Sequence, residues 1–155
     1  MSRAFVDESA SESREGDSPE LRKPLPPGAK NYVTPEGAAR TRSELAALLA
    51  APQPRLREVE RRIQYLSRMV AIMETVVPSA RPPERVVFGS TVTVDENGGG
   101  RRTYRIVGVD ESDPAAGHVS WISPIARALT GRRVGDSVVV SLPSQQLTLT
   151  VIAIG

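Results

Sequence analysis

The chain has no cysteine and only one histidine, His118, among its 155 residues. Without cysteine it can form no disulfide, thiol nucleophile or cysteine zinc site, and one histidine cannot serve a site that needs two. No apolar run is long enough to cross a bilayer, and residues 1–8 lack the basic-then-apolar order of a signal peptide. The lack of cysteine and of a second histidine excludes most metalloenzyme and catalytic-triad chemistries. We expect a soluble cytoplasmic protein with no membrane partner.

The net charge of +2 is too small to indicate a nucleic-acid partner by itself. Its distribution is uneven, because residues 1–20 hold six acids against Arg3 and Arg14, with Phe5 as their one aromatic residue. Such a segment cannot bury enough apolar surface to offset the entropy lost on ordering. We predict that residues 1–30 form a disordered acidic tail followed by a proline-rich linker. A solubilising extension is favoured over a specific docking arm.

A helix is predicted to begin directly after Thr34. The threonine hydroxyl can cap the first turn, and Pro35 suits the first helical position. A narrow apolar stripe follows at spacings of three and four residues: Ala38, Thr41, Leu45 and Leu48. The prolines in residues 52–54 must end this helix, because they cannot both occupy a helical interior.

A second apolar stripe begins at Leu56 and keeps a strict three-four alternation for about three heptads. Its members are Leu56, Val59, Ile63, Leu66, Val70, Met73 and Val77. Two such stripes joined by a short turn predict an antiparallel helical hairpin, a short coiled coil, over residues 31–77. Residues 78–85 contain three prolines and are predicted to be a linker.

From residue 86 the pattern changes to period two with β-branched residues, which predicts strands. The predicted strands are 86–88, 91–94, 103–109, 118–122, 137–142 and 147–154. We expect a tight hairpin turn at 97–100, a looser hairpin turn at 108–117 and a third turn at 143–144. Ser123 and Pro124 suit the cap and first position of a short helix at 123–129. The fold class is therefore α+β, with an antiparallel β-domain and one short helix over residues 86–155.

Pairs of acids are the remaining route to catalysis, and every pair falls in a predicted turn or loop. These acids are Asp95, Glu96, Asp110, Glu111, Asp113 and Asp136. Turn formation and solvated charge explain them better than acid-base chemistry does. The glycine-rich turn at 97–100 lacks the lysine and the following helix of a phosphate loop. We predict no catalytic residue, no metal site and no cofactor.

Arginines are concentrated in the second helical segment. They are Arg55, Arg57, Arg61, Arg62 and Arg68. Residues four apart share a helix face, so Arg57 and Arg61 lie together. This basic stripe could face RNA or a groove, but Glu58 and Glu60 dilute it, which favours the charged flank of a coiled coil.

Several short strings, taken in order, resemble the bacterial transcript cleavage factors GreA and GreB and their relative Rnk. The strings are YVTPEG at 32–37, RLREVERRIQYL at 55–66, YRIVG at 104–108, SPIARAL at 123–129 and VGD at 134–136. The resemblance covers about residues 32–154. It implies an FKBP-like fold for the C-terminal domain and RNA polymerase as the partner.

In that family the hairpin enters the secondary channel of RNA polymerase, where an acidic pair at its tip helps to hold Mg²⁺ for hydrolysis of backtracked RNA. Here residues 50–54 read AAPQP, and the stretch between Leu45 and Arg55 is far shorter than in GreA or GreB. The resemblance therefore implies a regulator of transcription elongation that docks without cleavage and is not an enzyme. Its short hairpin is similar to that of Rnk.

The resemblance also implies which residues contact the partner. The C-terminal domain would dock on the rim helices of the secondary channel through Ile122, Ser123, Pro124, Ala126 and Arg127. Ile122 departs from the polar or acidic residue often found before this Ser-Pro. The residues expected to face nucleic acid, either transcript RNA or DNA within the complex, are Arg57, Arg61, Arg62 and Arg68. We expect a monomer.

Two other functions stay open at this point. An FKBP-like domain suggests a prolyl isomerase, but that site needs an aromatic-lined pocket and this domain offers only Phe88, Tyr104 and Trp121. Alternatively, the helix arginines alone could bind free DNA or RNA. For that module we expect weak and nonspecific binding at most.

Overall fold

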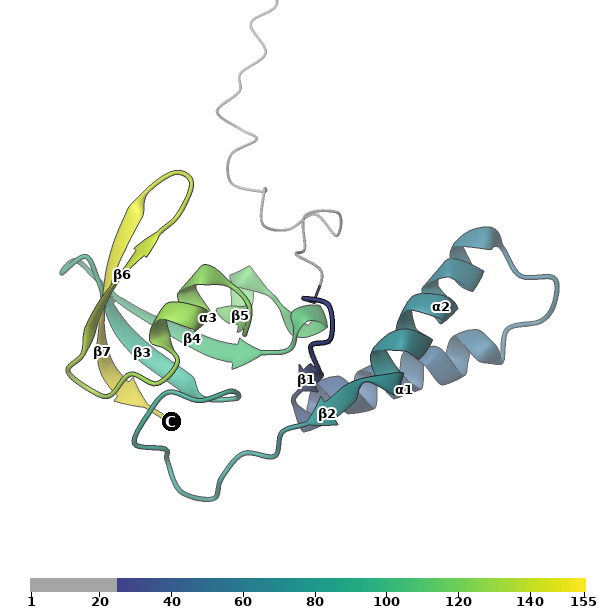
Figure 1. The fold of residues 1–155 in the computed structure, drawn as a ribbon, viewed down its shortest axis with the longest axis horizontal. Helices are drawn as coiled ribbons and strands as arrows, with labels where there is room; N and C mark the ends of the chain where they lie inside the picture. Colours follow the sequence, from purple (N-terminus) through teal and green to yellow (C-terminus); the bar gives the residue numbers. More distant parts are fainter. Residues whose placement is uncertain (1–24) are drawn as a thin grey trace, which may run out of the picture.

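The computed structural model describes residues 25–155, so most of the predicted acidic tail and linker lies outside the described residues. A helical hairpin projects from one side of a β-rich domain (Figure 1). Two short strands, β1 (Asn31–Val33) and β2 (Met73–Thr75), form the base of the hairpin, and a long connection leads from β2 to the β-domain. The predicted α+β class is confirmed. No helix in residues 25–155 is both long and apolar enough to cross a membrane.

Helices α1 (Pro35–Leu49) and α2 (Arg57–Ala71) form the two arms of the hairpin. α1 begins as predicted, because the Thr34 hydroxyl accepts a hydrogen bond of 3.1 Å from the Gly37 amide. The members of the two predicted stripes that are buried or partly buried within these helices are Ala38, Thr41, Leu45, Leu48, Val59, Ile63, Leu66 and Val70. The three-four spacing therefore identified the packed faces correctly.

The second helix is shorter than its apolar stripe predicts. Leu56 precedes α2 and is 70% exposed, while Met73 lies in β2 and Val77 lies beyond it. The helix ends where β1 supplies new partners for its last carbonyls. The amide of Asn31 donates to the Ile72 carbonyl at 2.9 Å, and its side-chain amide donates to the Met69 carbonyl at 3.1 Å. β1 and β2 then pair in parallel.

The β-domain contains one five-stranded sheet in the order β5-β4-β3-β7-β6. Its strands are β3 (Thr91–Glu96), β4 (Arg101–Val107), β5 (His118–Ser120), β6 (Ser137–Ser141) and β7 (Gln146–Ile154). All neighbours are antiparallel except β4 and β5, which are parallel. The short helix α3 (Pro124–Leu129) contributes Ala126 and Leu129 to the sheet core. As predicted, the Ser123 hydroxyl caps α3 by accepting from the Ala126 amide at 3.2 Å.

Two predictions for the β-domain are wrong. Residues 86–88 form no strand, although Val86 is completely buried and its backbone bonds with Arg132 and Gly131 at 2.8 Å each. The segment 108–117 is not a hairpin turn. It contains two 3₁₀ turns, η2 (Val109–Glu111) and η3 (Pro114–Ala116), which carry the chain across so that β5 runs parallel to β4. The predicted strand 103–109 therefore ends at residue 107.

Candidate functional site

A buried carboxylate, Glu111, joins the hairpin to the β-domain. Glu111 as a whole is only 9% exposed. One oxygen, Oε2, accepts hydrogen bonds from the amides of Thr34 at 3.0 Å and Gly108 at 2.9 Å, and Oε1 accepts from the Thr34 hydroxyl. The exposed guanidinium of Arg40 lies 3.7 Å away. The prediction that this loop acid is a solvated charge is wrong, because Glu111 holds the start of α1 against the end of β4.

Two glycines allow the backbones to approach this carboxylate. A Cβ on Gly37 would lie 2.2 Å from Cδ of Glu111, and a Cβ on Gly108 would lie 2.6 Å from the carbonyl oxygen of Tyr32. Both distances are far inside van der Waals contact, so a larger residue would displace the Glu111 carboxylate at Gly37 and the backbone of Tyr32 at Gly108. Both glycines end strings singled out in the sequence, but their spacing along the chain gave no sign that they share one contact.

Three aromatic rings form a second contact between the hairpin base and the β-domain. The ring centroid of Tyr32 lies 5.3 Å from that of Trp121, edge to face, and 6.2 Å from that of Phe88. The rings border a cavity of about 430 Å³ whose wall also includes Val76, Ile106, Arg127 and Thr130. Tyr104 lies elsewhere, in the sheet core, where burial raises the pKa of its phenol. The aromatic set considered for a prolyl isomerase is therefore not the set that the fold brings together.

The tip of the hairpin, residues 50–56, carries no acidic side chain. Arg55 closes this loop by donating to the carbonyls of Leu49 at 2.8 Å and Ala51 at 3.3 Å, and it pairs with Glu60 at 3.3 Å. Its side chain is only 14% exposed. Arg55 thus precedes α2 and caps the carboxyl end of α1 instead of adding to a basic helix face. No cluster of three or more potential metal ligands occurs in residues 25–155.

The predicted polymerase contacts lie around the N-terminus of α3. Pro124 and Arg127 are exposed there, while Ile122 and Ser123 are partly buried. Ala126 is completely buried in the sheet core, so its side chain cannot contact a partner in this conformation. The accessible part of this candidate surface therefore adjoins the aromatic cavity, which Arg127 also lines.

The arginines of α2 differ in what surrounds them. Arg57, Arg61 and Arg68 are exposed, and none makes an ion pair with another residue of the range 25–155. Arg62 instead donates two hydrogen bonds, of 2.7 and 3.1 Å, to Glu44 of α1. These bonds hold the pKa of the Glu44 carboxyl below its ordinary value. Arg62 therefore bridges the two arms, and the other three arginines are available to a partner.

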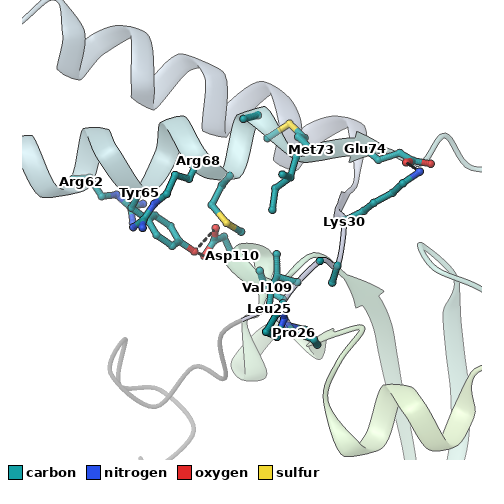
Figure 2. A pocket seen from close by; sticks show the side chains of 16 residues that line it. Leu25, Pro26, Lys30, Arg62, Tyr65, Arg68, Met73, Glu74, Val109 and Asp110 are labelled. Carbon is teal, nitrogen blue, oxygen red and sulfur yellow. Dashed lines mark hydrogen bonds and ion pairs between the residues drawn. The ribbon is translucent and has the colours of Figure 1, made fainter.

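A groove of about 880 Å³ lies beside α2 (Figure 2). Arg62, Tyr65 and Arg68 line it from the helix, and Leu25 lies across from them, next to η2. The hydroxyl of Tyr65 donates to the Asp110 carboxylate at 2.7 Å, and this bond ties α2 to the β-domain. Sequence reasoning missed this bond because the two residues are 45 positions apart.

Comparison with known proteins identifies the family. Residues 81–155 match the family model described as transcription elongation factor GreA/GreB, C-terminal. A transcription elongation factor GreB from Yersinia pestis is 36% identical over 128 residues, covering 83% of this chain and 74% of that protein. A GreB from Neisseria meningitidis serogroup B is 32% identical over 152 residues, covering 81% and 93%. The chain belongs to the GreA/GreB family.

This result confirms the resemblance indicated by the short strings, and the chain is a Gre-like transcription elongation factor of a bacterial family. Among solved structures, GreA factor homolog 1 (Gfh1) of Thermus thermophilus is 21% identical with a TM-score of 0.43, covering 82% of this chain and 99% of that one. A GreA/GreB factor from Nitrosomonas europaea is 23% identical with a TM-score of 0.42, covering 81% and 98%.

Proposed function

We propose that this Gre-like factor binds bacterial RNA polymerase at the secondary channel and regulates elongation without stimulating RNA cleavage. The observation that carries the proposal is the hairpin tip, residues 50–56, which has no carboxylate. Mg²⁺ requires hard oxygen ligands, and cleavage by factors of this family depends on an acidic pair at that position. The nearest acids, Glu44, Glu58 and Glu60, lie on the helices, and two of them are paired with arginines, Glu44 with Arg62 and Glu60 with Arg55.

The length of the hairpin supports the same proposal. α1 has 15 residues, which corresponds to an arm of roughly 22 Å. The alignment with the Neisseria protein runs over 152 positions, but only 81% of this 155-residue chain takes part in it. The other positions of the alignment are therefore residues of the Neisseria protein that this chain lacks. A shorter arm would place even an acid-bearing tip short of a catalytic centre that longer relatives reach. The chain would then occupy the channel mouth only.

The surface around α3 supplies the second part of the proposed docking. Pro124 and Arg127 are exposed, and the Ser123 hydroxyl caps the first turn of the helix that carries them. Because α3 is packed through Ala126 and Leu129, its exposed face is held on a rigid support. We propose that this face contacts the rim of the channel while Arg57, Arg61 and Arg68 face nucleic acid.

Binding is tested with purified bacterial core RNA polymerase and the immobilised full chain. We expect saturable binding, and we expect Arg127→Glu to weaken it about tenfold, since reversing a charge at an interface places like charges together. Arg133→Glu is the matched control, because Arg133 is also exposed in the β-domain but lies after α3. The proposal is wrong if the polymerase is not retained, or if both variants weaken binding equally.

Cleavage is tested separately with backtracked elongation complexes containing labelled RNA and Mg²⁺. Adding the chain alone should leave the cleavage rate unchanged. Adding it together with a GreB that does stimulate cleavage should slow the reaction, because both proteins would compete for one channel mouth. Faster cleavage with the chain alone would contradict the proposed lack of activity, and an unchanged GreB rate at saturating chain would contradict the shared site.

A further inference from the structure

We propose that the acidic N-terminal segment, residues 1–20, binds the arginine stripe of its own hairpin. The arginine stripe consists of Arg57, Arg61 and Arg68 on α2, with Arg62 beside it. The proposal assigns a specific intramolecular partner to a segment whose composition alone favours a solubilising role. It goes beyond the proposed function and is tested without RNA polymerase.

The first argument is the place where the described chain begins. Leu25 lines the groove beside α2 together with Arg62 and Arg68. Figure 2 shows Leu25 and Pro26 next to Val109, below the helix that carries these arginines. The described chain therefore begins at the groove that Arg62 and Arg68 line.

The second argument is reach. Glu20, Asp17 and Glu15 precede Leu25 by five, eight and ten residues. At roughly 3.3–3.6 Å per extended residue, these acids can reach about 17 to 35 Å from that point. Arg57 and Arg68 are eleven residues apart on α2, which is about 17 Å along the helix axis. The tether is thus long enough for the acids to reach every arginine of the stripe.

The third argument is complementary charge. Residues 1–20 hold six acids against two arginines. The three exposed arginines of the stripe make no ion pair with another residue of the range 25–155. The net charge of the segment is therefore opposite to that of the stripe.

Each exposed ion pair is weak by itself, and salt screens it. A tethered segment, however, is present at a high effective concentration, so several weak pairs can hold it on the helix. A consequence follows for function, because the same arginines are those proposed to face nucleic acid. The acidic segment would occupy them in the free protein and would have to be displaced by RNA or DNA.

The direct test uses a spin label, for which the chain is well suited because it has no native cysteine. A nitroxide attached to Ser13→Cys should broaden the backbone amide signals of residues 57–68 at low salt, and about 0.5 M NaCl should remove the broadening. The matched variant Arg57→Gln/Arg61→Gln/Arg68→Gln should lose the broadening while its β-domain signals stay in place.

Three outcomes would overturn the proposal. These are no broadening on α2, broadening that persists in the glutamine variant, and broadening that appears when labelled and isotope-enriched molecules are different copies. The last outcome would assign the segment to a second copy of the chain. Failure of RNA polymerase binding would leave this result untouched, so the two proposals fail independently.

A functional readout uses a fluorescent single-stranded RNA oligonucleotide as the probe. Neutralising the segment, with Asp7→Asn, Glu8→Gln, Glu12→Gln, Glu15→Gln, Asp17→Asn and Glu20→Gln, should tighten RNA binding at least about fivefold at low salt, the lower range of typical coupling between two ligands. A control with the serines at 9, 11, 13 and 18 changed to alanine keeps every acid and should bind like the natural chain. Equal affinity of the neutralised and natural chains would contradict the proposal.

Discussion

At the scale of single residues, Glu111 matters most for the position of the hairpin, although no role in catalysis or binding is proposed for it. Glu111 is buried at the junction of the hairpin and the β-domain, where it accepts hydrogen bonds from the backbone amides of Thr34 and Gly108 and from the Thr34 hydroxyl. A buried carboxylate is tolerable only with such donors, because an unsatisfied charge costs several kcal/mol. The orientation of the hairpin therefore depends on hydrogen bonds that span 77 positions of the sequence.

Replacing Gly37 tests how tightly this junction is packed. In Gly37→Ala the new Cβ would lie 2.2 Å from Cδ of Glu111, so the carboxylate must leave its donors. We expect the free energy of unfolding in urea to fall by about 1–3 kcal/mol, even though alanine favours helices more than glycine does. Gly100→Ala is the control, since nothing lies within 4 Å of a Cβ there. Unchanged stability in Gly37→Ala would contradict the packing argument.

The Glu44–Arg62 pair predicts a pH dependence. Hydrogen bonds from Arg62 lower the pKa of Glu44 from 4.5, so the pair stabilises the fold at pH values above 4.5 and loses this effect as the pH falls below it. Because both side chains are nearly half exposed, we expect Glu44→Gln to cost only a few tenths of a kcal/mol at pH 7. The difference from the natural chain should shrink and disappear as the pH falls through the lowered pKa of Glu44. Glu58→Gln, an exposed control on α2, should show no such loss.

At the scale of the elements, the hairpin is closed by backbone contacts at its tip and at its base. Arg55 caps the end of α1, and Asn31 caps the end of α2 while β1 pairs with β2. A short helical hairpin has little apolar surface of its own, so such capping contributes much of what keeps its ends ordered. The hairpin is thus a supported projection of the β-domain.

Truncating Arg55 should loosen the tip selectively. Arg55→Ala removes the donors to the Leu49 and Ala51 carbonyls, and we expect a loss of about 1 kcal/mol together with faster hydrogen exchange of amides 47–51. Arg57→Ala is the matched control, because Arg57 is exposed on the first turn of α2. If amides 47–51 exchange hydrogen at the same rate in both variants, Arg55 is not the residue that orders the tip.

At the scale of the whole molecule, the proposed activity depends on the distance between two surfaces. The exposed face of α3 lies on the β-domain, and the tip lies at the far end of the hairpin (Figure 1). The Glu111 junction, the Tyr32 ring contacts and the Tyr65–Asp110 bond hold these two parts together. In the proposed docking, the length of the hairpin therefore decides where the tip lies.

This arrangement predicts the result of adding acids to the tip. In Ala51→Asp/Gln53→Glu the loop gains two carboxylates, but its distance from the β-domain stays the same. We expect no faster cleavage in backtracked complexes and unchanged binding to RNA polymerase, because the limiting factor is reach. Measurable cleavage by this variant would show instead that the missing acids were the only obstacle.

Much of the architecture could be predicted from local patterns. Thr34 and Pro35 begin α1, Ser123 and Pro124 begin α3, and the glycines at 98–100 turn the chain from β3 into β4. These features depend on neighbouring residues, so capping rules and periodicity predict them well. The strings that resemble GreA and GreB were equally local, and they identified the family correctly.

The sequence by itself determined the capped helices, the apolar faces, the family and a tip without acids. Only the tertiary structure decided that α2 ends at Ala71, that β5 runs parallel to β4, that Ala126 is buried and that Glu111 is a junction. Each of these follows from partners distant in sequence: Asn31 for the helix end, two 3₁₀ turns for the strand, and Thr34 for the carboxylate. Periodicity records which face of an element is apolar, but it does not record which distant backbone group will meet it.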